Sequence, residues 1–433
     1  MARVSVAGVL LLAACGAFAQ DVRERQDPQE TRAAEPVPAV SQPVYERLAE
    51  ARACAQKDDM QCALRALERV RAIGDLTDYE LAQMWRLYAL VYLRQGSHAE
   101  AIAAYENALE PSAQPLGLRA ATMLALAELY ARQERYQDAL DTLGEWFLIA
   151  ENPNPEAYVL KAQIHHRLEQ YEQAVEPLVT GIEIARARGR EAEEGWYQLL
   201  AALYFELEND PKVIETLTVL VERWPKKEYL VQLAAMYGRT GEETLQLALY
   251  EAAYEAGWLT SEQEIVNLAR MLLQADIPYK AALLLQQGLD DGAIESTESN
   301  WQLLSEAWRL ARQDEKALPA LTRATQLAQD GELHFMLAQS YANLARWEEC
   351  AEAARDGLER GGLERPDQAN LLLGNCLTEL EQYDAARSAF EAAARDERSR
   401  ERAEQWLDYI ENEQDRERQL EQAVRRRAVQ RRG

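Results

Sequence analysis

The stretch WRLYALVYLRQGSHAEAIAAYENA, residues 85–108, decides the fold of this chain. Two small residues in it, Ala89 and Ala101, lie twelve positions apart, and Trp85 and Tyr92 are among the aromatic residues around them. The pattern returns about every 33 to 39 residues, a period typical of stacked repeat proteins. The place of Ala101 is taken elsewhere by Ala63, Ala139, Ala174, Val213, Ala281, Ala317, Cys350 and Ala386. The place of Ala89 is taken by Ala51, Ala127, Ala162, Ala201, Ala234, Ala269, Ser305, Ala338 and Gly374.

We number each repeat so that Ala89 is position 8, in helix A, and Ala101 is position 20, in helix B. Small residues at both positions let the two helices approach closely, and large residues between them fill the gap. The chain is rich in helix-forming residues, and no stretch alternates apolar and polar residues long enough for a strand. We therefore predict an all-α solenoid of about ten helical hairpins. In the sixth repeat, position 20 aligns with either Leu245 or Ala248.

These residues resemble the tetratricopeptide repeat family over 44–395, with Val213 and Cys350 as departures at position 20. The resemblance implies a right-handed superhelix of paired helices with a concave inner face. A last helix, at 396–413, carries Trp406 and is expected to cap the final repeat.

A narrower resemblance rests on the segments 226–238, 278–289 and 371–400. They are similar to exported tetratricopeptide repeat proteins of proteobacteria that are encoded beside TonB, ExbB and ExbD. This likeness implies a role beside a TonB-type uptake system.

The N-terminus reads as an export signal over 1–19. Arg3 precedes an apolar run too short to span a bilayer, and 17–19 form a small-x-small cleavage site. The alternative is a lipobox at 12–15, in which Cys15 is lipidated and anchors the protein to the outer membrane. Processing after residue 19 would instead give a periplasmic protein.

The two segments outside the repeats are polar. Residues 20–43 are predicted to be a disordered linker because they combine polar residues with several prolines. Residues 414–433 form a charged tail that is basic at its end, with Arg425, Arg426, Arg427, Arg431 and Arg432. This end is either a solvated, disordered tail or a contact to anionic lipid or to the acidic body of the protein.

Four cysteines remain after the predicted signal. Cys54 and Cys62 lie symmetrically about one turn, and Cys350 and Cys376 lie symmetrically about another. Equal distance from a turn places two residues at the same height on antiparallel helices, which a disulfide requires. Each pair is therefore a candidate disulfide, unless the cysteines only fill small buried positions.

The composition points away from catalysis. No nucleophile, phosphate-loop, dinucleotide or metal-ligand motif is present, and of the four histidines His165 and His334 occupy packing positions. We expect no enzyme activity, cofactor or metal. The formal net charge of −26 also argues against nucleic acid as a partner.

The expected partners are proteins, bound as an extended peptide or a helix along the inner face. By family analogy, positions 2, 5, 9, 12 and 13 of helix A line that face. Arginine recurs at position 13 and is suited to grip carboxylates of a peptide, although a cation at a helix C-terminus is also favoured by the helix dipole alone. The predicted lining includes Arg86, Leu90, Arg94, Glu128, Arg132, Gln163, His166, Arg167, Arg239, Gln302, Phe335, Gln339 and Asn375.

The sequence thus favours a non-catalytic periplasmic scaffold of the cell envelope, working with a TonB-type system. Two alternatives stay open: an outer-membrane lipoprotein that assists assembly of a pilus or secretion machine, and a periplasmic chaperone. Apart from a lipid anchor, membrane contact is expected only by association.

Overall fold

A computed structural model describes residues 38–430, with side chains described as far as residue 424. The predicted signal at 1–19, its Cys15, most of the linker and the arginine side chains from Arg425 onward lie outside the described residues.

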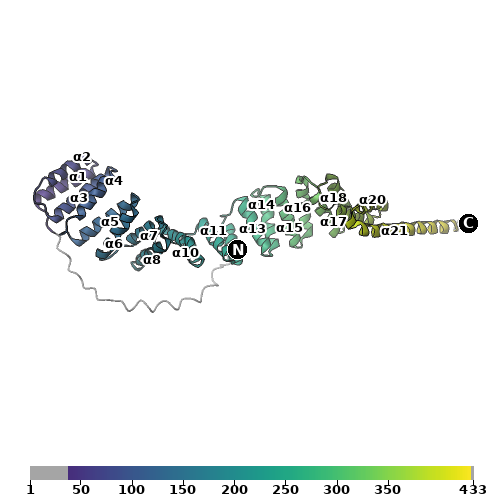
Figure 1. The fold of residues 1–433 in the computed structure, drawn as a ribbon. Helices are drawn as coiled ribbons and strands as arrows, with labels where there is room; N and C mark the ends of the chain where they lie inside the picture. The colour runs from purple at the N-terminus through teal and green to yellow at the C-terminus, as the bar shows by residue number, and fades with distance from the viewer. Residues whose placement is uncertain (1–37, 431–433) are drawn as a thin grey trace, which may run out of the picture. The chain divides into compact units, whose positions relative to one another are not determined.

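The described chain consists of helices and turns, and it divides into two compact units at Ala192 and Glu193. Within each unit, consecutive helices pack side by side in antiparallel pairs (Figure 1). The first unit contains α1 (Gln42–Gln56), α2 (Met60–Arg71), α3 (Asp78–Arg94), α4 (His98–Leu109), α5 (Leu116–Arg132), α6 (Tyr136–Ile149), α7 (Pro155–Arg167) and α8 (Tyr171–Ala187). The second unit contains α9 (Glu194–Glu206), α10 (Asp210–Arg223), α11 (Lys227–Arg239), α12 (Glu243–Glu255), α13 (Glu262–Gln274), α14 (Pro278–Asp290), α15 (Glu298–Leu310), α16 (Asp314–Leu327), α17 (Glu332–Asn343), α18 (Trp347–Arg360), α19 (Pro366–Glu379), α20 (Tyr383–Ala393) and α21 (Glu397–Gln430).

Each of the ten pairs turns from helix A to helix B in the same way. The residue at position 15 has positive φ, and the N–H after it donates to the carbonyl of position 11, as Ser97 does to Tyr92 at 2.9 Å. This bond closes a Schellman motif, which satisfies carbonyls that the helix end leaves free. Only Gly96 and Gly241 supply the positive φ with glycine; the other described pairs hold an ordinary residue there.

The small residues at positions 8 and 20 form the packed seam of each pair. Ala89 and Ala101 are fully buried, and so are most of their counterparts, which confirms that the repeated alanines mark close helix contacts. The residues that fill these positions in later pairs, Val213 and Cys350, are buried as well.

The sixth pair departs from the pattern. The register of its turn places Gln246 at position 20, so both expected alignments, on Leu245 and on Ala248, are wrong. A Cβ atom on Gly238 would lie 2.5 Å from Nε2 of Gln246. Glycine at position 238 therefore makes room for the larger side chain that replaces alanine.

The last helix closes the stack. The ring of Trp406 on α21 stacks on fully buried Phe390 of α20, with ring centroids 5.6 Å apart. Oγ of Ser399 donates to buried Asp367 of α19 at 2.6 Å. The helix was expected to end at residue 413, but α21 continues to Gln430 because Glu, Arg, Gln and Ala, all good helix formers, fill the segment.

We predict that Gly374→Ala destabilises the last repeat by about 1–3 kcal/mol. The new methyl group would lie 2.5 Å from Cε1 of Phe390, whose ring is enclosed on all sides. Urea unfolding followed by tryptophan fluorescence measures the loss. The control is Gly144→Ala in α6, where a Cβ meets nothing within 4 Å and should add about 0.5–1 kcal/mol. Equal effects of the two changes would contradict the packing described here.

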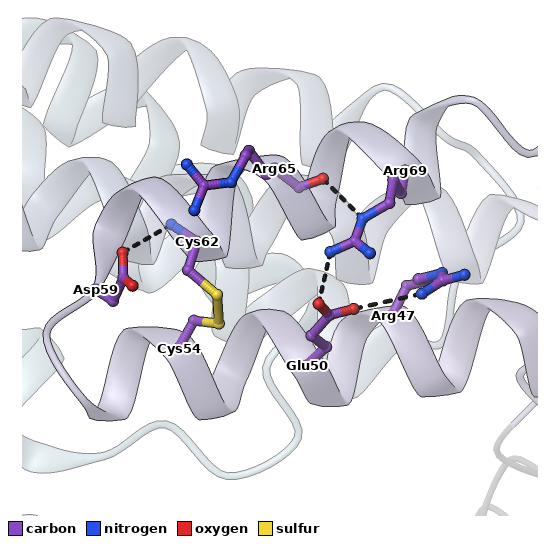
Figure 2. Close-up of a disulfide and its surroundings, with 7 residues drawn as sticks. All are labelled: Arg47, Glu50, Cys54, Asp59, Cys62, Arg65 and Arg69. Carbon is purple, nitrogen blue, oxygen red and sulfur yellow. Dashed lines mark hydrogen bonds and ion pairs between the residues drawn. A yellow bond between two sulfur atoms is a disulfide. The ribbon is translucent and has the colours of Figure 1, made fainter.

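One disulfide joins the two helices of the first pair, α1 and α2, and another joins helix B of the ninth pair, α18, to helix A of the tenth, α19. Cys54 is bonded to Cys62, with Cα atoms 5.7 Å apart, and Cys350 is bonded to Cys376, with Cα atoms 6.1 Å apart. Figure 2 shows the first bridge beside Asp59, which caps α2 by accepting from the Cys62 N–H at 2.9 Å. Further along the same two helices, Arg69 donates to Glu50.

The two disulfides should differ in their resistance to reduction. Cys350 and Cys376 are completely buried, whereas Cys54 and Cys62 are partly exposed. A mild thiol reductant under native conditions is expected to open the Cys54–Cys62 bridge and leave the other closed, as measured by alkylation and peptide mass spectrometry. Free thiols at all four cysteines in the untreated, denatured protein would show that neither bridge forms.

An ion pair links helices A of the sixth and seventh repeats. Nζ of Lys227 on α11 lies 2.6 Å from Oε1 of Glu264 on α13, and Glu264 also closes the capping box with Ser261. The hydrogen bond from Lys227 is the main cause that lowers the pKa of Glu264 from 4.5 to about 2.

We expect Glu264→Gln to lower stability in a pH-dependent way. A carboxyl whose folded-state pKa is depressed stabilises the fold above its unfolded pKa, near 4.5, and loses that effect as the pH falls toward 2. The difference in unfolding free energy between the protein and Glu264→Gln should therefore be full at pH 6 and shrink between about pH 4.5 and 2. Denaturant unfolding at several pH values checks this; a constant difference would contradict it.

Candidate partner-binding surfaces

The predicted inner face of the first unit is solvent-accessible and carries several cations. Arg132 and Arg167, at position 13 of α5 and α7, are exposed and make no hydrogen bond or ion pair within the described residues. Leu90, Glu128 and Gln163, at position 9, are also exposed. His166 is half-buried, with its ring 5.8 Å from that of Tyr171.

Arg94 differs from the other position-13 arginines of this unit. Its Nη1 donates to the carbonyl of Ala55 at 2.6 Å. It thus adds a second donor to a carbonyl in the last turn of α1 that also accepts from the Asp58 N–H at 3.2 Å, and a cation there is favoured by the helix dipole. The contact of Arg94 with α1 therefore favours a structural role at the helix end over binding of a partner.

Arg86, at position 5 of α3, is the most enclosed cation of this face. Its Nε is buried and has no hydrogen-bond acceptor within the described part of the chain. Burial lowers its pKa, and the nearby Tyr105 and Arg52 contribute in opposite directions. Burial in turn raises the pKa of Tyr105. Arg52, an exposed position-9 residue of α1 that was not among the predicted lining, adds a second positive charge here.

The second unit uses its predicted lining differently. Arg239 lies over the ring of Phe205 at 5.5 Å, and its Nε lies 3.2 Å from Oδ2 of Asp210, so its charge is already paired. Gln339 is exposed, whereas Gln302 and Asn375 are half-buried, and Oδ1 of Asn375 has no partner among the described residues.

Phe335 corrects the prediction. Its side chain is 7% exposed and lies in the core rather than on a binding surface. The reason is a close approach of α17 to α18, since a Cβ on Gly331 would lie 2.0 Å from the carbonyl oxygen of Gly357. Without side chains at these two glycines, the helices close over Phe335.

A pocket of about 490 Å³ opens in the second unit between α9 and α11, with α10 behind it. Its surface is mostly apolar, and pockets of this size and polarity are typical of ligand-binding sites. The lining comprises Gln198, Ala201, Ala202, Phe205, Glu206, Val213, Leu217, Leu220, Tyr229, Gln232, Ala235 and Met236. We call it the α9–α11 pocket.

The pocket exists because position 9 of helix A is alanine in two successive repeats. Ala202 and Ala235 hold that position in α9 and α11, where Leu90, Glu128 and Gln163 stand in the first unit. Small side chains leave the space between the helices unfilled. The sequence signal for the pocket is alanine at position 9 in two successive repeats, Ala202 and Ala235. A search for charged or polar groups at position 9 does not detect it.

Polar contacts fix one edge of the pocket. Tyr229 of α11 donates to Glu194 of α9 through its hydroxyl and accepts from Nε2 of Gln198 at 2.5 Å. Nζ of Lys226 lies 2.6 Å from Oε1 of Glu194. This network holds α9 and α11 at a set separation, so the pocket is preformed.

Neither a metal-ion cluster nor a membrane-spanning helix occurs in the described part of the chain. Residues 38–424 contain no group of three His, Cys, Asp or Glu side chains placed to hold a metal ion. No helix among the described residues combines the length and apolar character that a membrane crossing needs.

Comparison with known protein families identifies tetratricopeptide repeats in three segments of the chain. Family models described as tetratricopeptide repeat match residues 80–145, 155–188 and 367–395. No curated protein sequence matches the chain.

Several solved structures are similar. A tetratricopeptide repeat protein from Parabacteroides merdae is 16% identical, with 66% of this chain and 94% of that chain covered and a TM-score of 0.36. MamA from Desulfovibrio magneticus RS-1 is 21% identical, with 42% and 96% covered and a TM-score of 0.33. YrrB, described as a tetratricopeptide repeat protein with an unusual peptide-binding site, is 19% identical, with 42% and 91% covered and a TM-score of 0.33. These likenesses are too loose to transfer a partner.

The repeat matches and the ten helix pairs together establish the fold as an all-α solenoid of tetratricopeptide repeats. Such repeats generally mediate protein–protein interactions and typically form non-catalytic scaffolds.

Proposed function

We propose that this protein is a non-catalytic scaffold of the periplasm that holds proteins of the cell envelope together through its inner face. In this proposal its partners belong to a TonB-type energy-transduction and uptake system. The first unit binds a flexible, acidic segment of such a partner.

One observation carries the choice of an acidic segment. On a chain with a net charge of −26, four arginines of the first inner face, Arg52, Arg86, Arg132 and Arg167, have no carboxylate partner within 4.0 Å in the described structure. Arg239 of the second unit differs, because its Nε lies 3.2 Å from Oδ2 of Asp210. Cations that an acidic protein leaves unpaired on one face are suited to carboxylates from outside.

The physical mechanism is binding to a preformed surface. The A helices are fixed by their partners in each pair, so the scaffold need not reorder when a flexible segment binds, and the entropic cost falls on the segment alone. A guanidinium that is already partly desolvated, such as that of Arg86, gains most from a carboxylate, because forked hydrogen bonds replace missing ones.

Two further observations support the compartment and the partner class. The disulfides Cys54–Cys62 and Cys350–Cys376 fit an oxidising compartment such as the periplasm, which agrees with the signal expected at 1–19. The TonB-type system is proposed from the resemblance of segments such as 371–400 to exported repeat proteins encoded beside its components.

The test is a crosslinked pull-down of the full chain from intact cells, with partners identified by mass spectrometry. We expect to recover TonB, ExbB, ExbD or an outer-membrane receptor. The double change Arg132→Gln and Arg167→Gln should weaken binding of that partner by about tenfold or more, because each charged hydrogen bond contributes about 1.5–3 kcal/mol. Raising the salt concentration should weaken it further.

Two arginines of helices B provide the matched control. Arg65 and Arg223 are exposed, and the same change to glutamine there removes equal charge. Equal loss of binding in both double variants would show a general charge effect and contradict the inner-face site. Recovery of a different envelope complex would contradict the TonB assignment.

A further inference from the structure

The α9–α11 pocket combines an apolar interior with an unmet negative charge. Every cation carried by its two walls is already paired: Lys226 with Glu194, Lys227 with Glu264 and Arg239 with Asp210. Glu206, which lines the pocket, is exposed and makes no ion pair in the described structure. The pocket is therefore complementary to an apolar side chain that is followed by positive charge.

One segment of this acidic chain has that chemistry, and it is the C-terminal end of α21. Gln414 makes the last hydrogen bonds from α21 to α20, through Arg387 and Asp384. From residue 415 to 424 every side chain is exposed. Leu420 and Val424, four residues apart and therefore on one face of the helix, are 56% and 65% exposed.

Positive charge follows this apolar pair directly. Arg425, Arg426 and Arg427 come next in the sequence, in a chain that otherwise carries a large excess of carboxylates. Leu420 and Val424 thus form an exposed apolar pair, followed by positive charge, on the end of α21 that extends beyond the hydrogen bonds of Gln414 to α20.

We propose that the α9–α11 pocket receives the end of α21 from a second copy of the chain. Leu420 and Val424 enter the apolar interior, and the arginines that follow lie beside Glu206. This contact is independent of the acidic partner proposed for the first unit, because it uses another unit and the opposite charge.

The position of α21 in the stack points to a second copy as the source of the helix. The start of α21 is fixed to the last pair, α19 and α20, by Trp406 against Phe390, and α12 to α18 lie between that pair and α11 in the stack. The contact joins two different surfaces, so two copies that exchange their helices form a closed two-fold dimer, and one-way exchange forms rings or chains of copies.

The test uses a fluorescein-labelled peptide of residues 414–433, titrated into the full chain and followed by anisotropy. We expect saturable binding. Ala202→Trp, which fills the pocket from an exposed position, should weaken it by about tenfold or more, since two apolar side chains lose their site. Glu206→Lys should weaken it by at least about threefold, more strongly at low salt.

Matched controls separate this contact from general attraction between a basic peptide and an acidic protein. A peptide with Leu420→Ser and Val424→Ser keeps every charge and should bind about tenfold more weakly. Glu222→Lys makes the same charge change as Glu206→Lys at an exposed site outside the pocket and should leave binding unchanged. Equal binding by the two peptides, or equal effects of the two lysine variants, would overturn the proposal.

Sedimentation velocity of the full chain tests whether a second copy supplies the helix. The expected result is association that grows with concentration and is abolished by Leu420→Ser with Val424→Ser. A chain that stays monomeric at all concentrations would overturn the assignment to a second copy. Neither result depends on the arginines of the first unit, so this proposal and the acidic-partner proposal fail separately.

Discussion

The close contact between helix A and helix B at positions 8 and 20 is the constraint on which the rest of the structure depends. A small residue at both positions brings the backbones together in most pairs, and the same Schellman motif ends helix A in every described pair. The sixth pair shows how strict the constraint is. There Gln246 replaces alanine on helix B, and the facing residue on helix A is Gly238. The missing side chain of Gly238 provides the space that Gln246 occupies.

A fixed seam leaves the opposite side of helix A free to vary, and the two units use this freedom differently. The first unit places arginines there, among them Arg86 and Arg132, without matching carboxylates in the described residues. The second unit pairs Arg239 with Asp210 and has only alanine at positions 202 and 235, which opens an apolar pocket. The repeats therefore share one fold and present two different surfaces.

Much of the fold could be predicted from the sequence because the packing rule is local and repeated. The period, the helix pairs and the small residues of the seam follow from single positions such as Ala89 and Ala101. The register of the sixth repeat could not be predicted, because the glutamine at position 246 is tolerated only through a glycine on another helix. The end of α21 was missed for a different reason: a charged segment is a good helix former even where nothing packs against it.

The binding surfaces were harder to predict than the fold, since family analogy named positions but not the contacts made there. Arg94 was predicted to bind a partner like Arg132, but it donates to the carbonyl of Ala55. Phe335 was predicted to lie on the surface, because the close approach of Gly331 to Gly357 is a tertiary contact that the sequence pattern does not reveal.

If the two inner surfaces bind different segments, site-specific photocrosslinking in intact cells should separate them. One variant carries a photoreactive residue at position 132 and another carries it at position 202. We expect position 132 to capture an acidic segment of another envelope protein, whereas position 202 captures the end of α21 from a second copy. Capture of the same segment at both positions would contradict this division of the two surfaces.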